Sequence, residues 1–181
     1  MGCGLDSRIE RLGGATQPWY DIDFESVILE RKRYYQETEF YKMFGADITN
    51  KAFYKTLPKC EKAIVILEGV SMYIPNEQLK ELFTTLSERF NHLSVLVDCY
   101  TPFAAKMSKI KNPINDVGVT KVYGVKNPKD LENGAVKFKK EHEITPKDLI
   151  DQLCGVEKSI FNSLYAGKAS KKLYKLYEYE S

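Results

Sequence analysis

The chain has few of the residues that build metal centres or disulfide frameworks. It contains two histidines and four cysteines in 181 residues, and no cysteine pair has the C-x-x-C spacing of a zinc site. We therefore expect no metal ion. The cysteines stand far apart in the sequence, which is typical of a reduced, cytoplasmic protein rather than of a secreted protein with disulfides. They are Cys3, Cys60, Cys99 and Cys154.

Excess charge and long apolar runs are scarce as well. The net charge of +2 is too small to indicate binding to nucleic acid or to an anionic membrane. No apolar run approaches the length of a membrane-spanning helix, and the N-terminus lacks a signal-peptide pattern. With 43% hydrophobic and 29% charged residues, the composition is that of a globular protein. We expect a single domain over residues 1–181.

Strand and helix patterns alternate over the first half of the chain. We expect strands over residues 18–23, 63–67 and 93–98, the last two covered on both faces because their apolar runs are continuous. Helices are expected over 7–12 and 24–35, and a third begins near Pro75 with an apolar stripe of leucines and phenylalanines. This alternation predicts an α/β fold with a mostly parallel sheet.

The second half has a different character. Residues 119–125 and 136–144 alternate apolar and polar side chains, which predicts strands exposed on one face. Residues 146–154 and 157–165 have helical patterns, and residues 174–180 are expected to form a last edge strand.

A glycine turn opens the chain, with Gly2 and Gly4 on either side of Cys3. Glycine has no Cβ and tolerates positive φ, so such a turn lets the backbone approach a bound ligand closely. Glycine pairs also serve ordinary turns, and the motif alone does not decide between the two interpretations.

Acidic residues stand at the ends of three expected strands, at Asp23, Glu68 and Asp98. Ligands of open α/β sheets bind outside the carboxyl ends of the strands, and a carboxylate after the second strand accepts well from ribose hydroxyls. A single acid at such a position is often a helix cap or a turn former instead. Together with the glycine turn, the three acids favour a ligand site.

Four segments also follow one another in the order of a known family pattern. They are residues 2–8 (GCGLDSR, similar to G-x-G-x-D-T-R), 20–28 (YDIDFESVI, similar to Y-E-V-D-F-P-x-V-I), 45–48 (GADI, similar to G-A-D-L) and 67–75 (LEGVSMYIP, similar to A-E-G-V-L-M-Y-L-P). On these motifs the sequence resembles the leucine carboxyl methyltransferase family, which includes tetracenomycin-type polyketide O-methyltransferases. The last segment is the most specific of the four.

The resemblance implies a class I methyltransferase with a Rossmann-like, mostly parallel sheet and an antiparallel edge, binding S-adenosyl-L-methionine. Carried over by position, Gly2 and Gly4 would let the backbone approach the methionine and ribose parts of the cofactor. Asp23 would hold the ribose hydroxyls.

The remaining family positions concern the two ends of the cofactor. Asp47 and Ile48 would flank the adenine, and Glu68 would face the cationic amino group of the methionine part. The acceptor would be a carboxyl or hydroxyl oxygen of a small molecule, or less expectedly a protein C-terminus. The sequence assigns no catalytic residue.

The family pattern also includes an N-terminal segment and a first strand ahead of the glycine turn, whereas here Met1 directly precedes Gly2. The resemblance therefore leads us to expect an N-terminally truncated domain whose first strand is largely missing. That strand is central in the family, so its loss would leave two open edges. Self-association through the incomplete sheet is an expected consequence.

Three functions stay open on the sequence. The first is an S-adenosylmethionine-dependent O-methyltransferase, favoured by the set Asp23, Asp47 and Glu68. The second is a non-catalytic remnant that still binds the cofactor or a partner. The third, a nicotinamide-dependent oxidoreductase, is disfavoured because Ser7 stands where G-x-G-x-x-G needs its third glycine.

Overall fold

The computed structural model describes residues 1–108, 121–164, 166 and 172–181. Its strands are β1 (Trp19–Asp23), β2 (Tyr41–Gly45), β3 (Cys60–Leu67), β4 (Phe90–Tyr100), β5 (Lys137–His142) and β6 (Tyr174–Glu180). Its helices are α1 (Arg8–Arg11), α2 (Glu25–Arg31), α3 (Lys51–Tyr54), α4 (Asn76–Ser87), α5 (Pro102–Met107), α6 (Lys147–Ile150) and α7 (Gly155–Leu164), with short 3-10 turns η1 (Ser71–Tyr73) and η3 (Pro128–Leu131).

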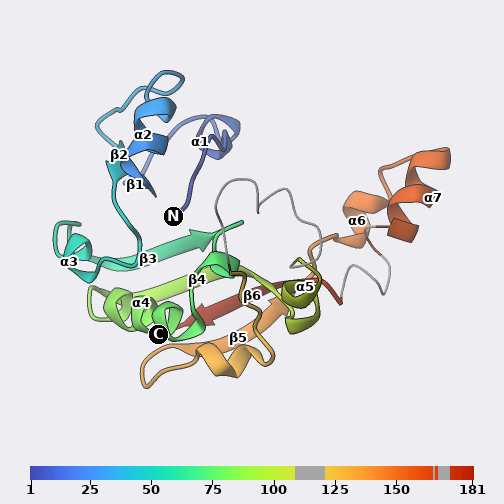
Figure 1. Ribbon diagram of the computed structural model, residues 1–181. Helices are drawn as coiled ribbons and strands as arrows, with labels where there is room; N and C mark the ends of the chain where they lie inside the picture. Colours follow the sequence, from blue (N-terminus) through green and yellow to red (C-terminus); the bar gives the residue numbers. More distant parts are fainter. Residues whose placement is uncertain (109–120, 165, 167–171) are drawn as a thin grey trace.

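The strands form two separate sheets. β1 and β2 are parallel and make up a two-stranded sheet, and helices α1 and α2 lie beside this sheet (Figure 1). The larger sheet has the order β3-β4-β6-β5, in which β3 and β4 are parallel and β6 is antiparallel to both of its neighbours. Helices α6 and α7 extend away from the large sheet (Figure 1). The predicted α/β class, with parallel strands and an antiparallel part, is confirmed.

The main core covers the large sheet and also includes Ile22 of β1. The expected apolar stripe of α4 is buried, and Phe83 on that helix packs on Tyr179 of β6 with ring centroids 5.2 Å apart. Helix α4 thereby covers one face of the large sheet (Figure 1). A smaller cluster of Ile9, Ile28, Tyr41 and Met43 lies between α1, α2 and the two-stranded sheet.

The last strand is not at the edge, so that prediction is wrong. β6 pairs with β4 on one side and β5 on the other. Its alternate residues Tyr177 and Tyr179 are buried, which requires covered surroundings. β5 takes the edge position, and its three lysines, Lys137, Lys139 and Lys140, suit an exposed edge.

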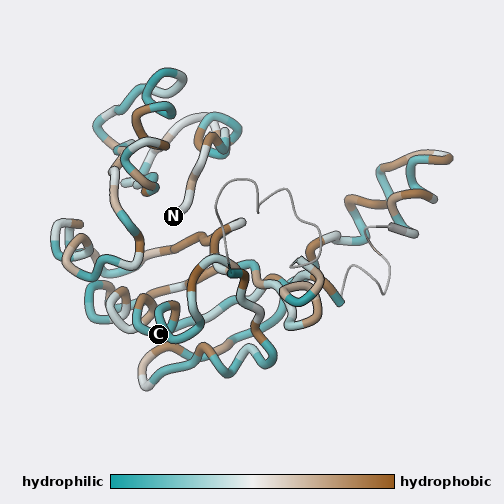
Figure 2. Tube along the Cα trace, viewed as in Figure 1, coloured by the Kyte–Doolittle hydropathy of each residue, from teal (hydrophilic) through white to brown (hydrophobic). Residues whose placement is uncertain are grey.

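The expectation that β3 is covered on both faces is also wrong. Val65 and Leu67 are buried in the main core, whereas Ile64, which directly precedes Val65 and lies on the opposite face of the strand, is 73% exposed. β3 pairs only with β4 among the described strands, so its other edge is unpaired. Its apolar run therefore supplies one buried face and one exposed face. Figure 2 shows this hydrophobic run along β3.

One predicted strand is absent over its described part. Residues 121–125 are irregular, and residues 119 and 120 lie outside the described residues. The Tyr123 amide donates to the Met72 carbonyl and the Val125 amide to the Tyr100 carbonyl. The backbone amides of this segment therefore donate to η1 and to the end of β4 instead of to a neighbouring strand.

The remaining helices agree with expectation in place but differ in length. Helix α2 ends at Arg31, short of the predicted residue 35, and Tyr165 at the end of the last predicted helix lies outside the described residues. Strand β2 and helix α3 were not expected as elements. Among the helices described, none is long and apolar enough to cross a membrane.

Candidate functional site

The glycine turn lies between the two sheets and is hydrogen-bonded to both. The Met1 ammonium donates to the Ile66 carbonyl of β3 (2.8 Å), and the Gly2 amide donates to the Ile22 carbonyl of β1 (2.7 Å). Desolvation by burial lowers the pKa of that ammonium below its ordinary value. Met1 and Gly2 thus lie where a strand between β1 and β3 would lie, next to Ile22 and Ile66.

The two glycines of the turn have different reasons to be glycine. Both have positive φ, +64° at Gly2 and +49° at Gly4. A Cβ on Gly2 would lie 2.0 Å from Val70 Cγ2, so the close packing of the turn on the segment after β3 requires glycine there. A Cβ on Gly4 would meet nothing within 4 Å. The backbone at Gly4 therefore faces open space in which a ligand has room to approach.

Asp23 fixes the turn. Its Oδ2 accepts from the Gly4 amide (2.8 Å) and its Oδ1 from the Phe24 amide (2.8 Å). A carboxylate oxygen has two lone pairs, so each oxygen retains acceptor capacity for a hydroxyl. Strand β1 ends at Asp23, and Phe24 occupies the N-cap position of α2, which starts at Glu25.

A buried ion pair supports the same turn from beneath. Arg31 is 1% exposed and donates to Asp21 Oδ2 (2.6 Å), to the Tyr41 hydroxyl (3.0 Å) and to the Gly4 carbonyl (3.1 Å). Asp21 also accepts from Tyr41 (2.7 Å) and from the indole of Trp19 (2.9 Å). Burial and the hydrogen bond to Asp21 raise the pKa of the Tyr41 phenol. Every charged group of the network therefore has a partner.

Sequence reasoning did not identify this network. The period of a strand places Asp21 on the same face as Asp23, and Arg31 has helical spacing relative to the apolar residue Ile28. Those two signals together could have indicated a buried acid and base beneath the turn.

Glu68 follows β3 and faces the glycine turn. Its carboxylate is 64% exposed and forms an ion pair with Arg8 Nη2, from the first residue of α1. We expected Glu68 as a site residue but not its partner. A carboxylate and a guanidinium thus lie side by side at this edge.

Asp47 and Ile48 lie after β2. Asp47 is exposed and forms an Asx turn, in which its Oδ1 accepts from the amide (2.8 Å) and hydroxyl (2.7 Å) of Thr49. The Ile48 side chain is buried in the main core. The neighbouring Ala46 amide donates to the Asp23 carbonyl (2.7 Å), which brings this turn next to the end of β1.

The structure therefore brings Gly2, Gly4, Asp23 and Glu68 together between the two sheets, with Asp47 close by through the backbone. Asp98 was expected to end its strand, but β4 continues to Tyr100, so Asp98 lies within the strand. It still joins these residues, because its Oδ2 accepts from the Gly69 amide (2.7 Å). Within the residues that the structure describes, no group of histidine, cysteine and acidic side chains could hold a metal ion. The cofactor roles of these residues stay predictions.

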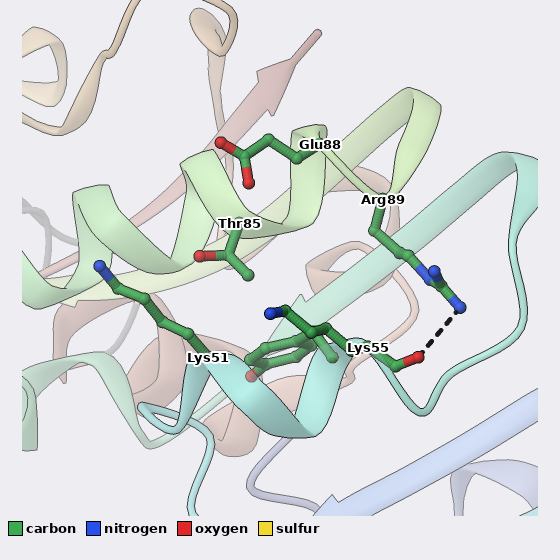
Figure 3. A pocket seen from close by; sticks show the side chains of 6 residues that line it. Lys51, Lys55, Thr85, Glu88 and Arg89 are labelled. Atoms are coloured by element: carbon green, nitrogen blue, oxygen red, sulfur yellow. Dashed lines mark hydrogen bonds between the residues drawn. The ribbon is translucent and has the colours of Figure 1, made fainter.

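A pocket lies elsewhere, between α3 and the end of α4 (Figure 3). It is lined by Lys51, Tyr54, Lys55, Thr85, Glu88 and Arg89. The Arg89 guanidinium donates to the Lys55 carbonyl (3.3 Å), which links the end of α4 to the end of α3. None of the predicted site residues lines this pocket.

Comparison with known proteins gives one curated relative and many similar structures. No family model matches the chain. The tetracenomycin polyketide synthesis O-methyltransferase TcmP of Streptomyces glaucescens is 31% identical over 134 residues, which are 74% of this chain and 50% of that protein. The chain thus spans about half the length of the curated relative that it matches.

The similar structures include several methyltransferases and an enzyme solved with SAM. An S-adenosylmethionine-dependent methyltransferase from Mesorhizobium loti superposes with a TM-score of 0.61 at 13% identity, covering 99% of this chain and 88% of that one. The complex of LepI with SAM gives 0.59 at 8% identity, with 99% and 41% covered. Magnesium protoporphyrin IX methyltransferase from Synechocystis PCC 6803 with bound SAH gives 0.55 at 13% identity, with 99% and 71% covered.

These likenesses agree with the motifs from which the resemblance was drawn. The chain therefore has the Rossmann-like fold of the S-adenosylmethionine-dependent methyltransferases and is related in sequence to the tetracenomycin O-methyltransferase.

Proposed function

We propose that this chain is an S-adenosyl-L-methionine-dependent O-methyltransferase domain of the leucine carboxyl methyltransferase type, acting on a carboxyl or hydroxyl oxygen of a small molecule. The sequence relative is an O-methyltransferase of polyketide synthesis, and several similar structures hold SAM or SAH. A cytoplasmic setting goes with this proposal, since all four cysteines are free thiols.

The observation that carries the proposal is the pairing of Gly4 with Asp23. The Gly4 and Phe24 amides donate to the carboxylate at the end of β1, and no described residue comes within 4 Å of the position that a Cβ on Gly4 would take. Two vicinal hydroxyls of a ribose are donors that suit such a carboxylate, because the charge strengthens both hydrogen bonds. The residues present therefore fit the ribose of the proposed cofactor.

Glu68 and Arg8 fit the amino-acid end of the proposed cofactor, its methionine part. An α-amino acid carries an ammonium and a carboxylate, and the Glu68–Arg8 ion pair offers one group of each opposite charge side by side. The two side chains are partly exposed (side-chain exposure 64% and 28%), so their mutual attraction is screened. Exchanging one partner for a ligand group of the same charge therefore costs little.

The cofactor supplies an electrophilic methyl group when bound, and the chain's own residues position and desolvate the reactants. A carboxylate acceptor is already ionised near neutral pH and needs no base. A hydroxyl acceptor requires a residue that accepts its proton. The Gly4 turn, Asp23 and Glu68 would orient the donor, and the ends of β3 and β4 would face the acceptor.

The test is calorimetric titration with SAM, SAH and NAD, followed by incubation with SAM and a panel of aromatic carboxylic acids and phenols, read by mass spectrometry. We expect SAM and SAH to bind, NAD not to bind, and an oxygen to be methylated. Binding of NAD in place of SAH would contradict the proposal. Binding of SAH without methylation of any acceptor in the panel would favour the non-catalytic alternative.

A further inference from the structure

Asp98 has a buried oxygen that no described residue uses. The residue is 3% exposed and lies near the carboxyl end of β4. Its Oδ2 accepts from the Gly69 amide (2.7 Å) and from the Tyr174 hydroxyl. Its Oδ1 is buried and accepts no hydrogen bond from any described residue. A desolvated carboxylate oxygen without a donor is costly and rare in native proteins, so this one calls for an explanation.

Aromatic rings surround this carboxyl group. Tyr100 and Tyr174 stand opposite each other on β4 and β6, with ring centroids 5.5 Å apart and planes at 64°. Tyr73 of η1 joins them, and all three are partly buried around Met72, Ala105 and Val122. Burial raises the pKa of Tyr73, and the neighbouring Tyr100 and Asp98 add to that shift. The four polar groups therefore share one partly apolar surface.

The cluster adjoins the proposed cofactor edge. Gly69, whose amide binds Asp98, directly follows Glu68. Burial raises the pKa of Asp98 and the nearby Glu68 charge raises it further, while the donors Tyr174 and Gly69 lower it. Aromatic faces with one well-placed acceptor are the usual lining of a site for a small planar ligand.

We propose that Asp98 and the tyrosines Tyr73 and Tyr100 bind the methyl acceptor, and that the acceptor is a hydroxylated aromatic compound whose hydroxyl donates to Asp98 Oδ1. The ring of such a compound packs against the tyrosine rings while its hydroxyl satisfies the one unused oxygen. The assignment of this ligand as acceptor rests on the proposed function, but the binding itself does not.

The probes are 2-naphthol, which has a hydroxyl donor, and 2-methoxynaphthalene, which has the same rings and no donor. We expect the chain to bind 2-naphthol about tenfold more tightly, the value of one hydrogen bond to a charged group. Titrations are run with and without SAH. Failure of SAH to bind would contradict the proposed function, whereas the naphthol preference tests Asp98 in either case.

The decisive variant is Asp98→Asn. Its amide oxygen can keep the bonds from Gly69 and Tyr174, which leaves the amide NH2, a donor, at the position of Oδ1. The preference for 2-naphthol should disappear. Tyr174→Phe is the matched control, because it removes a donor from Oδ2 and leaves Oδ1 unchanged, so the preference should persist.

A variant on the surface of the cluster covers the case in which Asp98→Asn does not fold. Tyr73→Leu removes a partly exposed ring and should weaken both probes by a similar factor. The proposal is overturned if the unaltered chain binds neither probe or shows no preference between them. A folded Asp98→Asn variant that keeps the preference, or a Tyr73→Leu variant that binds both probes as before, also overturns it.

Discussion

The amide nitrogen of Gly4 lies 2.8 Å from Oδ2 of Asp23, across 19 positions of the chain. The turn and the strand end are therefore one unit, in which the carboxylate sets the shape of the turn that it is proposed to serve. The same carboxylate also receives the Phe24 amide at the start of α2. Replacing Asp23 should affect both ligand binding and the local fold, and the two effects have to be measured separately.

We expect Asp23→Ala to weaken SAH binding by about 1.5–3 kcal/mol, the value of hydrogen bonds to a charged group. The amides of Gly4 and Phe24 also lose their acceptor, so the melting temperature should fall. Asp23→Asn, which keeps one amide oxygen for Gly4, should retain more of both. Calorimetric titration and thermal melts give the two quantities. Unchanged SAH affinity in a folded Asp23→Ala variant would remove Asp23 from the site.

Arg31→Met should be the more damaging of two arginine replacements. It leaves the buried Asp21 charge without its ionic partner, which costs about 3–5 kcal/mol of unfolding free energy. Arg33→Met is the matched control, because Arg33 pairs with Glu30 on an exposed surface with its own side chain 71% exposed. Urea unfolding compares the two variants. A small effect of Arg31→Met would mean that the network beneath the turn does not stabilise the fold.

Glu68→Gln should separate binding from stability. The ion pair with Arg8 is partly exposed, and the Glu68 side chain is 64% exposed, so its loss should change the unfolding free energy by less than about 1 kcal/mol. SAM binding should weaken, since the carboxylate is proposed to face the ammonium group. Glu61→Gln, at the other end of β3, is the control and should bind SAM as the unaltered chain does. A large loss of stability for Glu68→Gln would indicate a structural ion pair instead.

The cysteines should differ in reactivity. Burial raises the pKa of Cys3 from 9.0 to about 11 and that of Cys99 from 9.0 to about 12, so at pH 8 both are almost entirely thiols, which react poorly. Cys60 and Cys154 are exposed. Iodoacetamide at pH 8 should therefore alkylate Cys60 and Cys154 first, as peptide mass mapping would show. Early alkylation of Cys3 would contradict the buried setting of the glycine turn.

The open edges of β1 and β3 give a further prediction. β1 pairs only with β2 and β3 only with β4 among the described strands, while Met1 and Gly2 bond to both. An apolar strand fused ahead of Met1 should extend this bridge and raise the melting temperature and the SAH affinity. A fused glycine-serine segment of equal length is the control, since it also removes the buried ammonium.

Light scattering on the unfused chain and on the two fusions tests self-association through the open edges. We expect the unfused chain to associate and the strand fusion to be monomeric. A monomeric unfused chain that binds SAH as tightly as the strand fusion would show that the edges need no partner.

The sequence was sufficient for the elements whose signals are local. The stripe of α4 and the extent of β6 followed from side-chain period, and the acids at Asp23 and Glu68 from their places after apolar runs. The position of β6 within the sheet was not predictable in this way. Edge and interior strands of an antiparallel pair have the same period, and the order depends on contacts far apart in sequence.

The site shows the same division. Motifs indicated which residues gather near the glycine turn, but not the partners that they have there. The Glu68–Arg8 pair spans 60 positions, and the Arg31–Asp21 pair depends on how α2 packs over β1. The unused oxygen of Asp98 is a property of packing alone, because it depends on which donors are missing around it.

The interior position of β6 has a consequence for synthesis on the ribosome. β5 pairs only with β6 among the described strands, and β4 needs β6 along one edge. The large sheet therefore cannot close until β6 has been translated, and its assembly joins segments of high contact order. Until then the nascent chain carries the apolar strand β4 with one edge unpaired, the state in which chaperones recognise their clients. Loss of β6 alone would leave the molecule permanently in that state.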